Sequence, residues 1–179
     1  MRNAWILTAL PWALAACSEP AAPPHVILVS IDTLRADHLS CYGYGRATSP
    51  FLDGLAARGI LFERAFSSAP WTLPAHLSML TGLFPSQHGV VAEELALARD
   101  VPLLAERLQA AGYATLGLYR PSWVHARHGF ARGFDVFRAH ETVEEARAHA
   151  LEELAMLDPA QPTFLFLHLF DVHNGALAQ

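Results

Sequence analysis

The sequence predicts an α/β fold with a mainly parallel sheet flanked by helices. Short apolar runs of strand length alternate along the chain with longer stretches whose apolar residues recur at helical spacing. Strands separated by helices are joined by crossover connections, which make neighbouring strands parallel. An acidic residue, Asp32, directly follows the first strand, at the end where open α/β sheets bind ligands. With 179 residues and 53% apolar content, one sizeable core and a single domain are expected.

The first residues have the pattern of an export signal rather than of a folded element. Residues 1–17 contain a positive Arg2, an apolar stretch and the segment LAAC, which matches a bacterial lipobox. This pattern predicts that Cys17 is lipidated and that the protein is exported, held at the periplasmic face of a membrane or at the cell surface. The apolar stretch is short for a spanning helix, although an uncleaved anchor remains the alternative.

Residues 18–24, SEPAAPP, are expected to form a semi-extended tether because prolines favour the polyproline II conformation. The folded domain is then expected over residues 25–179. Within it Cys41 has no second cysteine to pair with, so we expect it to act as a small buried hydrophobe.

The first strand is predicted over residues 26–31, a continuous apolar and β-branched run that is typical of a strand buried on both faces. The next helix is expected to have Ser49 as its cap and Pro50 at its first position, and to end near Gly59. A short strand is expected over residues 60–65.

A second helix is predicted over residues 73–81, with Pro74 in its first turn and Gly82 just past its end. Thr72 directly precedes this helix. We expect its hydroxyl to face the same crevice as Asp32. A threonine at this position could equally be only a helix cap.

The remaining elements continue the alternation. We expect a helix over residues 102–111 with Asp100 as its cap and Gly112 as its stop, a strand over 113–119, a structural turn over 132–137, a helix over 141–157 with a capping box of Thr142 and Glu145, and a buried strand over 163–170.

The charge pattern excludes one class of partner. The formal net charge is −5, all twelve basic residues are arginines and the chain has no lysine, so no basic stripe suited to nucleic acid is present. An anionic substrate would have to be attracted locally, by arginine or histidine.

Five segments in chain order resemble the sulfatase branch of the alkaline phosphatase superfamily. They are the strand ending at Asp32, the run PAHLSMLTG at 74–82, QHGV at 87–90, HGFARGFD at 128–135, and the strand that leads to LFDVH at 169–173. The resemblance implies an alkaline-phosphatase-like fold and a metal-dependent hydrolase of sulfate or phosphate esters.

The resemblance also implies roles for individual residues. Asp32 would bind a divalent metal, Ca²⁺ being the first expectation and Mg²⁺, Mn²⁺ or Zn²⁺ the others, although it could merely cap a turn. Thr72 stands where true sulfatases carry a Cys or Ser that becomes formylglycine, a conversion that threonine cannot undergo. Its unmodified hydroxyl could still be the nucleophile and a second metal ligand.

Two histidines, His76 and His173, are expected in the site, and a third, His168, is expected outside it. His76 replaces the family's arginine, and it could donate to a bound anion, orient Thr72 or be structural. His173 matches the histidine that contacts the ester or protonates its leaving group. His168, inside the last strand, is expected to be a core histidine, with a catalytic role as the alternative.

The family's later Asp-His-Gly segment, which completes the metal site, does not occur after His173. The chain therefore resembles the N-terminal part of a longer enzyme, apparently truncated. The expected function is that of a sulfatase-like, metal-dependent hydrolase acting on a small-molecule, glycan or lipid ester. The alternatives are a phosphoglycerol- or phosphoethanolamine-type transferase and a catalytically inactive lipoprotein remnant.

Overall fold

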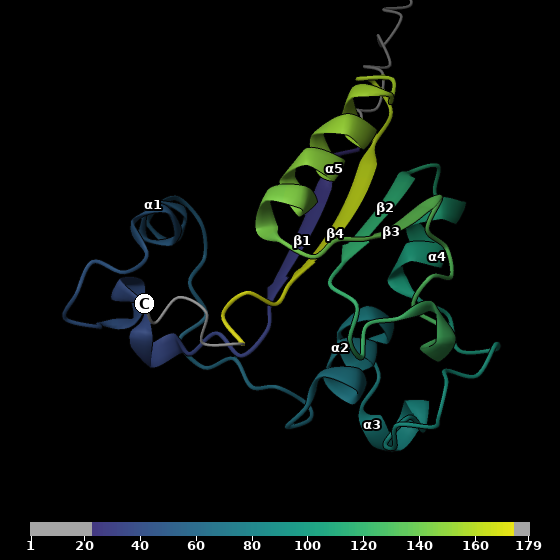
Figure 1. Cartoon of the computed structure of the whole chain (residues 1–179), viewed down its shortest axis with the longest axis horizontal. Coiled ribbons are helices and arrows are strands. Elements are labelled where there is room, and N and C mark those ends of the chain that lie inside the picture. The colour runs from purple at the N-terminus through teal and green to yellow at the C-terminus, as the bar shows by residue number, and fades with distance from the viewer. Residues whose placement is uncertain (1–22, 174–179) are drawn as a thin grey trace, which may run out of the picture.

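The computed structural model describes residues 23–173 (Figure 1). The predicted leader with Cys17, residues 18–22 of the predicted tether, and residues 174–179 lie outside the described residues. None of the described helices has the length and apolar character needed to span a membrane.

A four-stranded parallel sheet forms the centre of the molecule, as the sequence predicts. Its strands are β1 (Val26–Ile31), β2 (Ala114–Tyr119), β3 (Val136–Ala139) and β4 (Thr163–Leu169), in the order β1-β4-β2-β3. The strand β3 was not expected, because the pattern of residues 132–137 indicates a turn. Its four residues include Arg138, whose guanidinium reaches Glu152 and Glu153 of the helix above.

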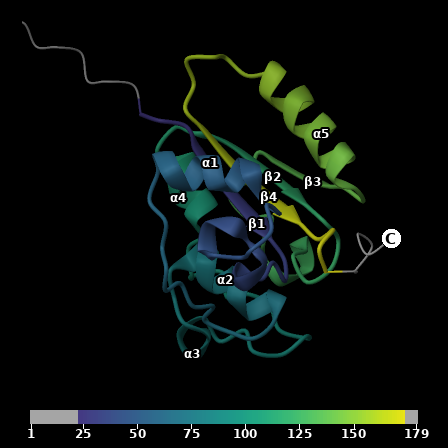
Figure 2. The same ribbon diagram turned by 90° about the vertical axis from the view of Figure 1, so that its left-hand side faces the viewer.

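Helices cover both faces of this sheet (Figures 1 and 2). The helix α5 (Val143–Ala155) packs on one face, where Leu116, Leu118 and Leu165 form a small core. The larger core lies on the other face, under α2 (Thr72–Thr81) and α4 (Leu104–Ala110). Two further α-helices are α1 (Pro50–Arg58) and the single turn α3 (Pro85–His88), and one-turn 3₁₀ segments span Ala36–His38, Ser40–Tyr42 and Ala126–His128.

The expectation that residues 26–31 form a strand buried on both faces is wrong on one face. The strand β1 is at the end of the strand order, and Ile27 and Val29 are 65% and 48% exposed. Their neighbours Val26 and Leu28 point the other way and pack against the larger core. The helix α5 contacts β2 in the middle of the sheet and so leaves this face of β1 open.

Two other local expectations are also wrong. Residues 60–65 form no regular element, and Ile60 and Phe62 are 82% and 69% exposed, so this run lacks the pairing partner that a strand requires. The helix α4 begins at Leu104 rather than at 102, and Leu103 instead of Asp100 is its cap. The Glu106 carboxylate accepts the Leu103 N–H at 2.8 Å, which closes the first turn there.

The turn at residues 132–133 holds the start of α4 in place. The Arg132 guanidinium donates to both oxygens of Glu106 and to the carbonyls of Ala98 and Val101, at 2.6–3.1 Å. Gly133 follows with φ +75°, and a Cβ there would lie 2.2 Å from the Glu106 backbone nitrogen. Only glycine fits this approach without moving the backbone.

The start of α5 agrees with its predicted position and differs in one bond. Thr142 Oγ1 accepts the Glu145 N–H at 3.2 Å, as a capping box requires. The Glu145 carboxylate, however, accepts the N–H of Glu141 at 2.7 Å rather than that of Thr142. The return hydrogen bond of the capping box therefore reaches one residue further toward the N-terminus, to Glu141 instead of Thr142.

Candidate functional site

Asp32 lies at the carboxyl end of β1, where the strand order and register place it beside β4. Its backbone N–H donates to the Leu169 carbonyl at 2.9 Å, and its side chain is almost fully buried. Ser30 is the register partner of His168. Because alternate strand residues share a face, Ser30, Asp32 and His168 all face the side of the sheet that α2 covers.

Thr72 is the first residue of α2, and its hydroxyl meets Asp32. The Thr72 Oγ1 donates to Asp32 Oδ2 at 2.9 Å, across 40 positions of sequence. The N-cap residue is Trp71, so the Thr72 side chain caps no helix N–H. The structure thus brings together the two oxygens that the sequence predicts to converge.

His76 lies one turn further along α2 and has both ring nitrogens engaged. Its Nδ1 is 2.8 Å from the Thr72 carbonyl, which can only accept, so Nδ1 carries the proton. Its Nε2, 2.7 Å from Ser30 Oγ, must then accept the serine hydroxyl. Burial lowers the pKa of His76, which agrees with this neutral tautomer.

His168 is completely buried between β4 and α2. Its ring centroid is 4.7 Å from that of His76, and neither of its ring nitrogens has a hydrogen-bond partner among residues 23–173. Burial, followed by the neighbouring His76 and His140, lowers the pKa of His168 to about 3. It is therefore a neutral imidazole with an unused lone pair.

These side chains form the one group of buried potential metal ligands found among the described residues. One ligand atom from each of Asp32, His76 and His168 lies within 4.8 Å of the other two. The His168 imidazole is buried without a hydrogen-bond partner among the described residues and could donate a lone pair to a cation, so the three side chains fit a divalent ion. Asp32 and Thr72, the two ligands expected from the sequence, lie within hydrogen-bond distance of each other, and sequence reasoning did not propose His76 or His168 as candidate ligands.

The residue after Asp32 has an unusual backbone conformation. Thr33 has φ +56° and is the only residue other than glycine with a positive φ in residues 23–173. A β-branched side chain is strained there, and such strain persists only where the surroundings impose it. It turns the chain sharply at the point where the Asp32 carboxylate must face α2.

His173 lies outside this cluster. It is exposed in the turn after β4, where its ring stacks on that of Phe170 with centroids 4.1 Å apart. Its backbone N–H donates to the Phe170 carbonyl at 3.1 Å. No hydrogen bond within the described part of the chain joins it to Asp171. The turn is at the same edge of the sheet as Asp32, because β1 and β4 are parallel neighbours.

His88 supports α2 and does not line the site. Its Nδ1 accepts the Val90 N–H at 3.1 Å, and its Nε2 lies 3.1 Å from Ser78 Oγ and 3.3 Å from the Pro74 carbonyl. Burial lowers the pKa of this neutral imidazole. Protonation of His88 Nδ1 would place its new N–H against the backbone N–H of Val90.

We expect the free energy of unfolding of the chain to decrease as the pH is lowered, partly because of His88. Because its folded pKa is depressed, its contribution is complete above about pH 6.5 and is lost below it, by at most about 1.4 kcal/mol per pH unit. The variant His88→Asn retains an acceptor for Val90 but no titration, so its free energy of unfolding should change less between pH 6.5 and 5. Urea unfolding at several pH values measures this. The exposed His38→Asn is the control, and identical pH slopes for wild type and His88→Asn would contradict the expectation.

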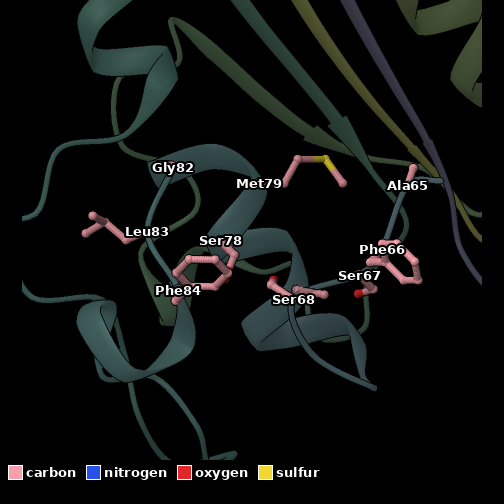
Figure 3. A pocket seen from close by; sticks show the side chains of 10 residues that line it. Ala65, Phe66, Ser67, Ser68, Ser78, Met79, Gly82, Leu83 and Phe84 are labelled. Carbon is pink, nitrogen blue, oxygen red and sulfur yellow. The ribbon is translucent and has the colours of Figure 1, made fainter. Parts of the chain in front are cut away.

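A groove of about 500 Å³ lies on the outer side of α2 (Figure 3). Ala75, Ser78 and Met79 line the groove from the helix, and Phe66 and Phe84 line it from the neighbouring loops. It is apolar, and none of Asp32, Thr72, His76 and His168 lines it. The candidate catalytic groups are therefore at the buried side and start of α2, apart from this groove.

Comparisons with known proteins identify related sequences and a related fold. Residues 24–178 match the family model described as Sulfatase. The chain is 32% identical to arylsulfatase A of Bos taurus over 155 residues, covering 79% of this chain and 30% of that protein. It is 32% identical to an N-acetylgalactosamine-6-O-sulfatase of Bacteroides thetaiotaomicron over 97 residues, covering 51% of this chain and 19% of that protein.

A solved structure shows the same fold. It is a protein in complex with its substrate D-glucosamine-2-N,6-O-disulfate, with a TM-score of 0.71 at 20% identity over 82% of this chain and 34% of that one. The chain thus spans about a third or less of the length of these similar proteins.

Proposed function

The chain belongs to the sulfatase family, and from this premise we propose that it acts on sulfate esters with Thr72 as the nucleophile. The observation that carries the proposal is the 2.9 Å hydrogen bond from Thr72 Oγ1 to Asp32 Oδ2 at the start of α2. A nucleophile needs a fixed direction and an acceptor for its proton, and the buried Asp32 carboxylate provides both.

The surroundings of Thr72 suit attack on an anionic ester. The first N–H groups of a helix have no partner within the helix, so the start of α2 carries partial positive charge beside the hydroxyl. The hydrogen bond of His76 to the Thr72 carbonyl fixes this first turn. A divalent cation held by Asp32, His76 and His168 would supply positive charge that lowers the pKa of the hydroxyl and neutralises oxygens of the ester.

The proposed reaction has two steps. The Thr72 oxygen bonds to sulfur as the bond from sulfur to the alcohol oxygen breaks, and the Thr72 proton passes to Asp32. We assign protonation of the departing alcohol to His173, because it follows β4 at the same sheet edge as Asp32. Water then attacks the sulfur, and the bond from sulfur to the Thr72 oxygen breaks. Asp32 returns its proton to the Thr72 oxygen and His173 takes one proton from the water, so hydrogen sulfate leaves and both groups regain their starting states.

The relatives support a substrate class for this proposal. They include an arylsulfatase and an N-acetylgalactosamine-6-O-sulfatase, and one fold neighbour was solved with a sulfated glucosamine. We propose a glycan or aryl sulfate. We also propose, from the LAAC motif at residues 14–17, that lipidation of Cys17 holds the protein at the periplasmic face of a membrane.

A transferase is the second candidate. An unmodified threonine forms a covalent ester, and the group held in that ester could pass to an acceptor alcohol instead of to water. This favours a phosphoglycerol- or phosphoethanolamine-type reaction as the alternative. The experiment offers aryl sulfate and aryl phosphate, each with and without glycerol as acceptor. Turnover of aryl sulfate without glycerol supports the hydrolase, whereas turnover only of aryl phosphate with glycerol supports the transferase. No turnover of either ester by the folded, metal-loaded chain would support the inactive remnant and contradict both activities.

A further inference from the structure

We propose that Asp32, His76 and His168 form a nitrogen-rich metal site that binds Zn²⁺ or a similar transition metal in preference to Ca²⁺, with His168 as a ligand. The site is the one used in the proposed function. The inference concerns binding alone, however, and can be tested without turnover.

The first argument is the position of His168 on its strand. Phe164 and Phe166 precede it on the same face of β4 and are completely buried in the larger core. A third phenylalanine would continue this packing. Instead the chain buries an imidazole whose two nitrogens have no hydrogen-bond partner among residues 23–173, and a buried polar atom without a bond is destabilising. A bound cation would satisfy one nitrogen.

The second argument is the hydrogen bonding of His76. Histidines that bind metals almost always donate their other ring N–H to a carboxylate, a carbonyl or water, which fixes the tautomer. His76 Nδ1 already donates to the Thr72 carbonyl at 2.8 Å. Its other ring nitrogen, Nε2, has the Ser30 hydroxyl as its partner, and this hydroxyl can rotate away when a cation takes its place.

The third argument is the chemistry of the donor atoms. One carboxylate and two imidazoles are a typical three-ligand set for catalytic Zn²⁺, with a fourth position left for water or substrate. Ca²⁺ takes about six to eight oxygen ligands. Among the described residues, the hydroxyls of Thr72 and Ser30 hydrogen-bond to Asp32 and His76, and the two other candidate ligands of the cluster beside Asp32 are nitrogens. The expectation of Ca²⁺, which came from the family resemblance, is replaced by this preference.

The test measures metal binding to the chelator-treated chain by isothermal titration. We expect one Zn²⁺ or Co²⁺ per chain, and at least 100-fold weaker binding of Ca²⁺. The variant His168→Phe should lower the affinity for Zn²⁺ at least 100-fold. The matched control His88→Asn, at a buried histidine away from the cluster, should leave it within threefold. Ca²⁺ binding as tight as Zn²⁺ binding, or unchanged Zn²⁺ affinity in His168→Phe, would overturn the proposal.

A measurement on the wild-type chain covers the case in which His168→Phe does not fold. Co²⁺ bound by nitrogen ligands in four-coordinate geometry absorbs strongly in the visible, whereas Co²⁺ in a six-oxygen site absorbs weakly. Strong absorption that Zn²⁺ abolishes supports the inference, and weak absorption contradicts it. A Ca²⁺-dependent enzyme with Thr72 as nucleophile would refute this inference alone, and a Zn²⁺-binding chain without esterase activity would refute only the proposed function.

Discussion

Replacing Thr72 with alanine is expected to reduce kcat for a sulfate ester by at least about 1,000-fold, as loss of a nucleophile does in enzymes with a covalent step. The methyl side chain keeps the α2 backbone and removes the only oxygen that donates to Asp32 Oδ2 from this helix. KM should change little, because the hydroxyl acts mainly in the transition state. Steady-state kinetics on an aryl sulfate measure both constants.

Two variants make this result specific to the nucleophile. Thr72→Ser retains the hydroxyl, so we expect it to keep activity within about tenfold of wild type. Thr81→Ala removes a hydroxyl at the other end of α2, where Oγ1 donates to the Leu77 carbonyl at 2.7 Å, and it should leave kcat nearly unchanged. A folded Thr72→Ala variant with wild-type turnover would show that the nucleophile is another group.

Gly133→Ala is expected to lower the free energy of unfolding by more than about 3 kcal/mol. The added Cβ would lie 2.2 Å from the backbone nitrogen and 2.5 Å from the Cα of Glu106, and φ is +75°. Both contacts are with backbone at the start of α4, so a side-chain rotation cannot relieve them. The shift would also pull apart the bonds that Arg132 makes to Glu106.

The control for this substitution is Gly112→Ala. Gly112 also has a left-handed backbone, with φ +87°, but a Cβ there meets nothing within 4 Å. Only the conformational strain remains, about 1–2 kcal/mol. Urea unfolding of the two variants separates the clash from the strain, and equal losses in free energy of unfolding would show that the contact with Glu106 is not what requires glycine.

The strands β1, β2 and β4 could be predicted because each is a run of apolar residues bounded by turn residues. The strand β3 could not, since it is four residues long and carries Arg138 toward α5. The exposure of Ile27 depends on which strand is at the edge and on where α5 packs. Strand order is not local information, and no pattern within residues 26–31 contains it.

The candidate site also has one contact that could be predicted from the sequence and one that could not. The meeting of Asp32 and Thr72 was predictable because a strand end and a helix start in an α/β fold face a common crevice. The approach of His168 to His76 was not, because it follows from the alignment of Ser30 with His168 across two strands far apart in sequence. One feature of the sequence could have indicated that Ser30 and His168 are aligned. His168 lies one residue before the end of β4, and Ser30 lies one residue before the end of β1.

Thr33 bears on any attempt to make this protein resist heat. Its left-handed backbone at φ +56° would be easier for glycine or asparagine, so laboratory selection for thermal tolerance would favour those residues at this position. Glycine would also widen the range of backbone conformations open to the residue that directly follows Asp32. Substitution of Thr33 should then raise thermal stability and lower the catalytic rate. A sequence selected for thermal stability alone would therefore lose activity.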